Sequence, residues 1–151
     1  FNTYGPRQSD RAVIPTIIHQ LLRKDSLVLG SLFPERDFTY VLDTVQAFLL
    51  AGRAPKVEGQ VIHVGSGRTI PVQRLVRAIS RLLGRPMPPI RQDPKRVRPP
   101  ASEVGRLIAD PRRARALLGW RAATSLEEGL AATIRWIRQH PEWYQWERFF
   151  V

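Results

Sequence analysis

The feature that most limits the fold of this chain is a series of amphipathic helical patterns separated by only short strand-like runs. In the clearest pattern, Val72–Leu83, apolar residues recur on one side and arginines on the other. Further helices are expected over Ile14–Arg23, Thr39–Leu50, Asp110 to about Gly119, Ser125–Gln139 and Glu142–Phe150. Strand-like runs cover Ser26–Leu29, Gln60–Val64, the surroundings of Ile90, and Arg106–Ala109. The chain is therefore expected to be α/β or α+β, with too few strands for a complete parallel sheet in 151 residues.

Capping residues mark two of the helix starts. Asp110 and Pro111 are typical of an N-cap followed by the first helical position. Ser125 and Glu128 have the spacing of a capping box, in which each side chain satisfies a backbone N–H group of the other residue. Pro141 is expected to break the helix that this box opens.

Composition excludes several classes of protein. The hydrophobic fraction of 43% and the mean hydropathy of −0.25 fit a globular chain, and no apolar run is long enough to span a bilayer. Cysteine is absent, which excludes disulfides and thiolate metal sites, and the three histidines lack metal-ligand spacing. We expect a cytoplasmic protein without a metal. The chain opens at Phe1 with no signal-peptide pattern, and this first residue is interpreted as a cut point.

The net charge is +11 and the sequence pI is about 11.4. Such a charge fits a polyanion partner, either nucleic acid or a phosphate compound. However, 21 of the 24 basic residues are arginines, since only three are lysines, and they are dispersed along the chain. Dispersed arginines indicate an arginine-rich coding bias and disfavour a nucleic-acid-binding surface.

Four segments, in this order and spacing, resemble the extended short-chain dehydrogenases/reductases, the family of NAD-dependent nucleotide-sugar epimerases and 4,6-dehydratases. Within that family they are most similar to UDP-N-acetylglucosamine 4,6-dehydratases and UDP-glucose 4-epimerases. The segments are Asn2-Thr3-Tyr4-Gly5-Pro6-Arg7, Val13-Ile14-Pro15, Arg36-Asp37-Phe38-Thr39-Tyr40-Val41-Leu42-Asp43, and Arg98-Pro99 followed by Ser102-Glu103, Ala109-Asp110 and Leu117-Leu118-Gly119-Trp120.

This resemblance implies an α/β fold, the C-terminal substrate-binding part of a Rossmann-type enzyme. Residues 1–151 would form the nucleotide-sugar-binding domain, with residues 1–12 as the end of the catalytic region. The parent enzyme would oxidise the sugar, at C4 in our interpretation, by hydride transfer to NAD. It is expected to be a homodimer built by helices of the cofactor half.

Two elements that the family's chemistry needs are missing from this sequence. The glycine-rich turn that holds the NAD pyrophosphate is absent, because Gly65-Ser66-Gly67 lacks the third glycine and is interpreted as a strand-to-helix turn. No Tyr-x-x-x-Lys pair is present either. We therefore expect the N-terminal dinucleotide-binding half to be missing and to be this chain's partner. The chain alone is expected to be inactive and not to bind NAD tightly.

The resemblance also implies roles for individual residues. Arg36 and Arg98 would bind the substrate diphosphate, since a guanidinium group suits two phosphate oxygens, and Asn2 would contact the diphosphate or the sugar. Glu103 would accept hydrogen bonds from the ribose hydroxyls. Three of these residues also have an ordinary interpretation: a turn asparagine for Asn2, a helix-entry arginine paired with Asp37 or Asp43 for Arg36, and a solvated charge for Arg98.

Val13 and Leu29 would form walls near the uracil ring, and both could equally be core residues. Phe1 would lie beside the nicotinamide. The expected substrate is a UDP-sugar or another NDP-sugar. Two other interpretations stay open: a binding module or remnant without activity, and a basic nucleic-acid-binding domain.

Overall fold

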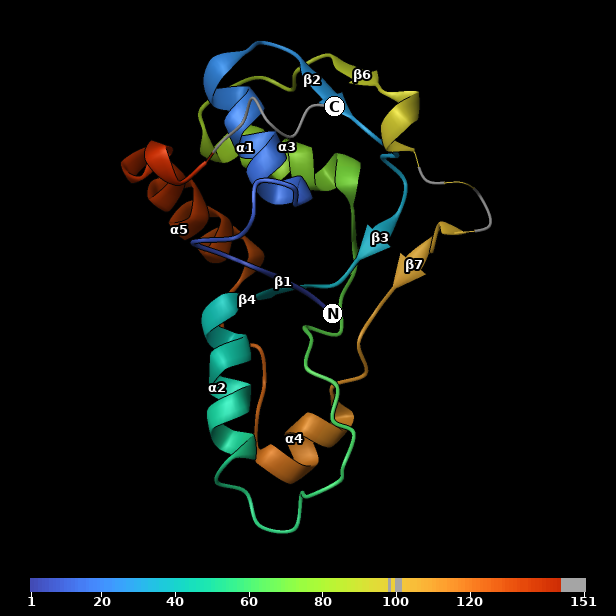
Figure 1. Ribbon diagram of the computed structural model, residues 1–151, viewed down its shortest axis with the longest axis vertical. Coiled ribbons are helices and arrows are strands. Elements are labelled where there is room, and N and C mark those ends of the chain that lie inside the picture. The colour runs from blue at the N-terminus through green and yellow to red at the C-terminus, as the bar shows by residue number, and fades with distance from the viewer. Residues whose placement is uncertain (98, 100–101, 145–151) are drawn as a thin grey trace.

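The computed structural model describes residues 1–97, 99 and 102–144. Figure 1 shows an elongated molecule, with helices at both ends and short strands between them. The helices are α1 (Val13–Arg23), α2 (Val41–Ala51), α3 (Val72–Leu82), α4 (Arg112–Leu118) and α5 (Leu126–Gln139), with short 3-10 turns at Pro94–Arg96 and Pro141–Trp143.

The described strands form three small sheets instead of one continuous sheet. In the first, β1 (Asn2–Tyr4) pairs in parallel with β4 (Phe38–Tyr40). In the second, β2 (Leu27–Leu29) pairs in parallel with β6 (Ile90–Gln92). In the third, β3 (Glu35–Arg36) lies between β5 (Ile70–Pro71), which is antiparallel to it, and β7 (Arg106–Leu107), which is parallel.

The larger hydrophobic core lies among α1, α3 and α5, the upper end in Figure 1. Each of these helices presents an apolar stripe, and in α3 the stripe is opposite a row of arginines, as the sequence pattern indicates. Tyr4 of β1 is also buried in this core and donates a hydrogen bond from its hydroxyl to the Leu126 carbonyl oxygen over 3.3 Å. Burial raises the pKa of Tyr4 far above its usual range. The core thus joins the central strands to the start of α5.

A smaller core lies at the other end of the molecule, between α2 and α4. Trp120 is buried there and donates from its indole Nε1 to the Asp43 carbonyl oxygen over 2.8 Å. The Asp43 carboxylate accepts from the backbone N–H group and the hydroxyl of Thr124 at 3.0 and 3.2 Å. These bonds fix the segment between α4 and α5 against the first turn of α2.

Several predicted elements are confirmed, with shifted boundaries. The capping box at Ser125 and Glu128 is present, and α4 ends at Leu118 with Gly119 as its C-cap, whose φ of 62° is left-handed. α4 begins at Arg112 with Pro111 as its N-cap, one residue later than the predicted N-cap Asp110 and first helical residue Pro111. The Asp110 carboxylate still accepts from the backbone N–H group of Arg112, and hydrogen bonds from Arg112 lower the pKa of Asp110 to about 2.

Two predictions are wrong. The segment Phe38–Tyr40 is strand β4, so the helix expected from Thr39 begins only at Val41, because pairing with β1 satisfies the backbone of these residues. The strand expected at Gln60–Val64 does not form. A strand needs a neighbour, and no strand of the described part pairs with this segment, in which Val61 stays exposed.

Where the final helix is expected, over Glu142–Phe150, the structure has only the 3-10 turn Pro141–Trp143 followed by the extended Tyr144, and residues 145–151 lie outside the described part of the chain. Among the described residues, no helix is both long and apolar enough to cross a membrane.

Candidate functional site

The side chain of Arg36 is the centre of a group of polar contacts beside strand β3. Its Nη2 atom pairs with Oε1 of Glu103 at 2.8 Å, and Nη1 donates to the carbonyl oxygens of Val104 at 2.6 Å and Glu35 at 3.0 Å. Both charged side chains are largely buried, with exposed fractions of 16% and 22%. Three contacts on one guanidinium group hold it in a fixed orientation and hold the segment at Glu103 against β3.

Asn2 lies next to this group. Both its backbone N–H group and its side-chain Nδ2 donate to the carbonyl oxygen of Asp37, each over 3.2 Å. Because Asp37 follows Arg36 in the chain, the structure brings together three of the residues singled out in the sequence: Asn2, Arg36 and Glu103. They come from β1, from β3 and from the segment before β7.

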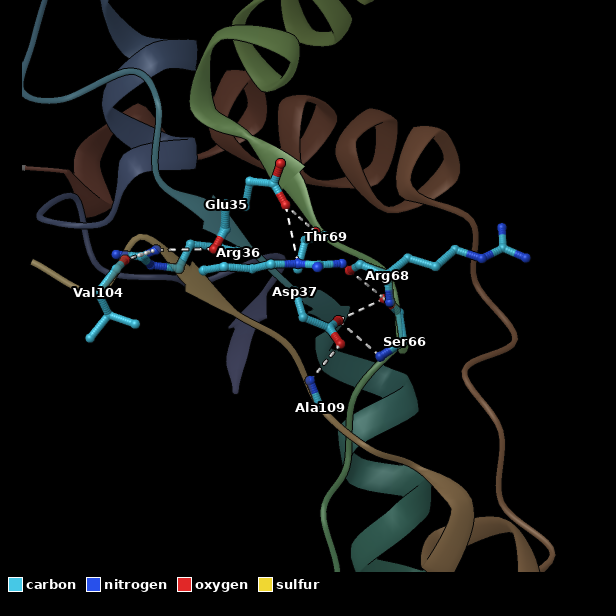
Figure 2. A network of polar contacts seen from close by, with 9 residues as sticks. Glu35, Arg36, Asp37, Ser66, Arg68, Thr69, Val104 and Ala109 are labelled. Carbon is cyan, nitrogen blue, oxygen red and sulfur yellow. Dashed lines mark hydrogen bonds and ion pairs between the residues drawn. The ribbon is translucent and has the colours of Figure 1, made fainter.

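The carboxylate of Asp37 joins the turn at Ser66 and Gly67 to the segment at Ala109, as Figure 2 shows, and we call these residues the Asp37 corner. One oxygen accepts from the backbone N–H group and the hydroxyl of Ser66 at 2.9 and 2.6 Å. The other accepts from the N–H groups of Gly67 and Ala109 at 2.9 and 3.2 Å. Asp37 is fully buried, so these donors replace the water that the carboxylate loses.

In the turn Gly65-Ser66-Gly67, the N–H groups of Ser66 and Gly67 therefore donate to Asp37 and are not free to bind a phosphate. A β-carbon at Gly65 would overlap the side chain of Ala109, so the turn needs glycine where the two segments meet. Glu35 also joins β3 to the segment after this turn, since its carboxylate accepts a hydrogen bond from the Thr69 hydroxyl at 2.6 Å.

The remaining predicted residues lie elsewhere. Leu29 is buried in the larger core and Val13 packs against that core, which is the ordinary alternative for both, so their place beside a base stays a prediction. Phe1 is 44% exposed, and its ring meets the edge of the His63 ring at 5.5 Å between centroids. Arg98 lies outside the described residues.

The structure also contains a pocket of about 530 Å³ on another side of the Asp37 corner. None of the predicted substrate residues that the structure describes lines it. It lies between the segment at residues 65–70 and the segment that leads into α5. Within the described chain, no group of three or more histidines and acidic residues could hold a metal ion.

The sequence analysis does not identify Asp37 as a residue that joins distant segments, although its sequence context carries a signal. It stands directly before the run Phe38-Thr39-Tyr40-Val41, which is mostly apolar. A carboxylate beside such a buried run requires several hydrogen-bond donors. The donors at Ser66 and Ala109 are 29 and 72 residues away in sequence, and no local pattern predicts them.

Comparison with known proteins agrees with this fold. A family model described as GDP-mannose 4,6 dehydratase matches residues 1–133. The chain belongs to this family, within the extended short-chain dehydrogenases/reductases that include nucleotide-sugar epimerases and 4,6-dehydratases. The α/β fold expected from the resemblance is confirmed.

A curated relative and two solved structures illustrate the similarity. UDP-glucose 4-epimerase of Mycolicibacterium smegmatis is 33% identical over 141 residues, which are 91% of this chain and 43% of the relative. The UDP-glucose 4-epimerase of Thermotoga maritima, solved with UDP-glucose, has a TM-score of 0.80 and 31% identity over 93% of this chain and 44% of that one. The UDP-glucuronic acid 4-epimerase of Bacillus cereus, solved with NAD, has a TM-score of 0.75 and 25% identity over 92% and 43%. The chain thus spans less than half the length of these proteins.

Proposed function

We propose that this chain is the nucleotide-sugar-binding domain, residues 1–151, of an NAD-dependent epimerase or dehydratase of the cytoplasm. The guanidinium group of Arg36 would hold the diphosphate of a UDP-sugar or another NDP-sugar, with Asn2 beside it and Arg98 as a second arginine. Glu103 would accept from the ribose hydroxyls. Val13 and Leu29 would lie near the base, and Phe1 near the nicotinamide.

The observation that carries the proposal is the fixed, largely buried guanidinium group of Arg36 with Asn2 next to it. Its contacts occupy Nη1 and Nη2 and leave other N–H donors of the five in a guanidinium group for phosphate oxygens. Glu103 neutralises Arg36 while no anion is bound. A diphosphate brings the negative charge that lets Glu103 turn to the ribose.

We propose that this chain does not itself hold NAD. The N–H groups of Ser66 and Gly67, in the Gly-x-Gly turn, bind Asp37 instead. We therefore assign NAD to a separate dinucleotide-binding half.

The face of α2 that turns away from α4 fits such a partner. Leu42, Val45, Phe48 and Leu49 are all exposed on this helix, and Phe48 reaches 75%. Positions 42, 45 and 49 recur at helical spacing, so they share one face. A contiguous apolar face of this kind normally packs against another part of a protein. We propose that it packs against the dinucleotide-binding half, and that the complete enzyme is a homodimer.

The test is an NMR titration of the chain with UDP-glucose. We expect shifts of the backbone amides at residues 35–37 and 103–104. Arg36→Ala should weaken binding by about ten- to a hundred-fold, since a charge-assisted contact contributes on the order of 1.5–3 kcal/mol. Arg36→Lys should recover only part of the loss, because an ammonium group lacks the two-pronged geometry.

The control is Arg135→Ala, which removes the same charge from the exposed side of α5. It should leave the affinity unchanged. Equal affinity of the wild type and Arg36→Ala, or shifts confined to residues away from Arg36, would overturn the proposal.

A further inference from the structure

The pocket of about 530 Å³ has a volume within the ordinary range for small-molecule sites, roughly 300–1,000 Å³. Its walls are held in place by two buried carboxylates. Asp37 fixes the wall at Ser66, and Asp43 fixes the wall at Thr124. A pocket whose walls are fixed before a ligand arrives binds with a smaller entropy loss.

Three arginines line this pocket: Arg68, Arg115 and Arg121. None of their guanidinium groups makes a hydrogen bond or ion pair with another residue of the described chain. Figure 2 shows the side chain of Arg68 extending away from the Asp37 contacts. Its charged end lies toward the segment that leads into α5, the opposite wall of the pocket.

The carboxylates near the pocket are directed to other donors. Asp37 binds Ser66, Asp43 binds Thr124, and Glu128 binds Ser125. Glu127 is the one acidic residue in the lining, and it pairs with Arg81 at 3.2 Å. Three positive charges and one negative charge leave the lining with a charge of +2. The hydroxyls of the walls are already bonded, so the arginines supply the side-chain donors left for a ligand.

We propose that this pocket is a second anion site, which binds a phosphate-bearing small molecule through Arg68, Arg115 and Arg121. A phosphate group carries about two negative charges, which balance the +2 of the lining. Guanidinium groups also bind phosphate oxygens in pairs. The apolar side chains of Ile70 and Leu126 in the lining would contact the organic part of the ligand. The site does not include Asn2, Arg36 or Glu103, and it does not depend on the function proposed above.

The test is an NMR titration of the chain with inorganic pyrophosphate, with acetate at equal ionic strength as the reference. We expect saturable shifts of the amides at residues 68–70 and 121–126 with pyrophosphate, and none with acetate. The triple variant Arg68→Ala, Arg115→Ala, Arg121→Ala should weaken this binding at least about tenfold, since charge-assisted contacts are lost.

A matched variant separates this site from the general positive charge of the chain. Arg74→Ala, Arg77→Ala, Arg135→Ala removes three exposed arginines outside the pocket lining and should leave the pyrophosphate affinity unchanged. An equal loss in both triple variants, or no shift at residues 68–70 and 121–126, would overturn the proposal. Shifts found only near Arg36, and lost in Arg36→Ala, would also overturn it while supporting the nucleotide-sugar site.

Discussion

At the scale of single residues, two buried aspartates organise the molecule more than any ion pair does. Asp37 joins β4 to the segments at Ser66 and Ala109, and Asp43 joins α2 to the segment at Thr124. Each carboxylate accepts from backbone and hydroxyl groups, so its charge is spread over donors that carry no charge. Arg36 is held beside Asp37, and its position thus depends on the same corner.

We expect Asp37→Asn to lower the free energy of unfolding by roughly 3 kcal/mol, since hydrogen bonds to a charged group are each worth about 1.5–3 kcal/mol. The amide of asparagine would also turn an N–H group toward N–H donors. Urea unfolding at pH 7 measures the change. The exposed Glu58→Gln is the control, and a loss no larger than that of the control would show that the corner tolerates an amide.

His19 makes stability depend on pH. It is buried in α1, and burial, together with the nearby Arg23 and Lys24, lowers the pKa of His19 from 6.5 to about 4. Between these two values the unfolded chain binds more protons at this site than the folded chain, so stability is complete above pH 6.5 and falls as the pH falls toward 4.

Between pH 7 and pH 5 the wild type should lose about 2 kcal/mol more unfolding free energy than His19→Gln does. Urea unfolding of both proteins at the two pH values tests this. The exposed His63→Gln should behave like the wild type. Parallel losses in the wild type and His19→Gln would rule out this role of His19.

At the scale of elements, two features at the start of helix α5 determine its position. The capping box fixes where it begins, and Gly129 lets its first turn approach β1 and β4. A β-carbon at Gly129 would overlap the hydroxyl of Tyr4 and lie 2.9 Å from Cδ2 of Tyr40. Close packing, and not helix propensity, therefore determines the residue at this position.

Helix propensity alone predicts that Gly129→Ala stabilises α5 by about 1 kcal/mol. We expect the opposite, a destabilisation of about 1–3 kcal/mol, because the added methyl group overpacks the core. The control is Gly52→Ala at the end of α2, where φ is −68° and the nearest atom to an added β-carbon is 3.6 Å away. Chemical denaturation that shows Gly129→Ala to be at least as stable as the wild type contradicts the packing argument.

The helices could be predicted from the sequence because their signals are local. The stripe of Val72–Leu83 and the box at Ser125 and Glu128 each lie within a few residues. The strands are harder to predict from the sequence, since β3 and β5 have two residues each and exist only through pairing with distant segments. The same holds for the site, where the Arg36–Glu103 pair joins residues 67 positions apart.

At the scale of the whole molecule, the chain combines two packed ends with exposed apolar surface on α2 and at Val61. The segment Gln60–Val64 has a strand-like sequence and no strand beside it in the described chain. The M. smegmatis relative is more than twice as long as this chain, since the match covers 91% of this chain and 43% of that enzyme. All three features support our proposal that this domain packs against a separate dinucleotide-binding half.

The most direct test of this account is calorimetry on the 151-residue chain, titrated separately with UDP-glucose and with NAD. The account predicts that UDP-glucose binds, that Arg36→Ala weakens this binding at least about tenfold, and that NAD shows no binding at micromolar concentrations. Micromolar affinity for NAD, or UDP-glucose binding that is the same in the wild type and in Arg36→Ala, would contradict it.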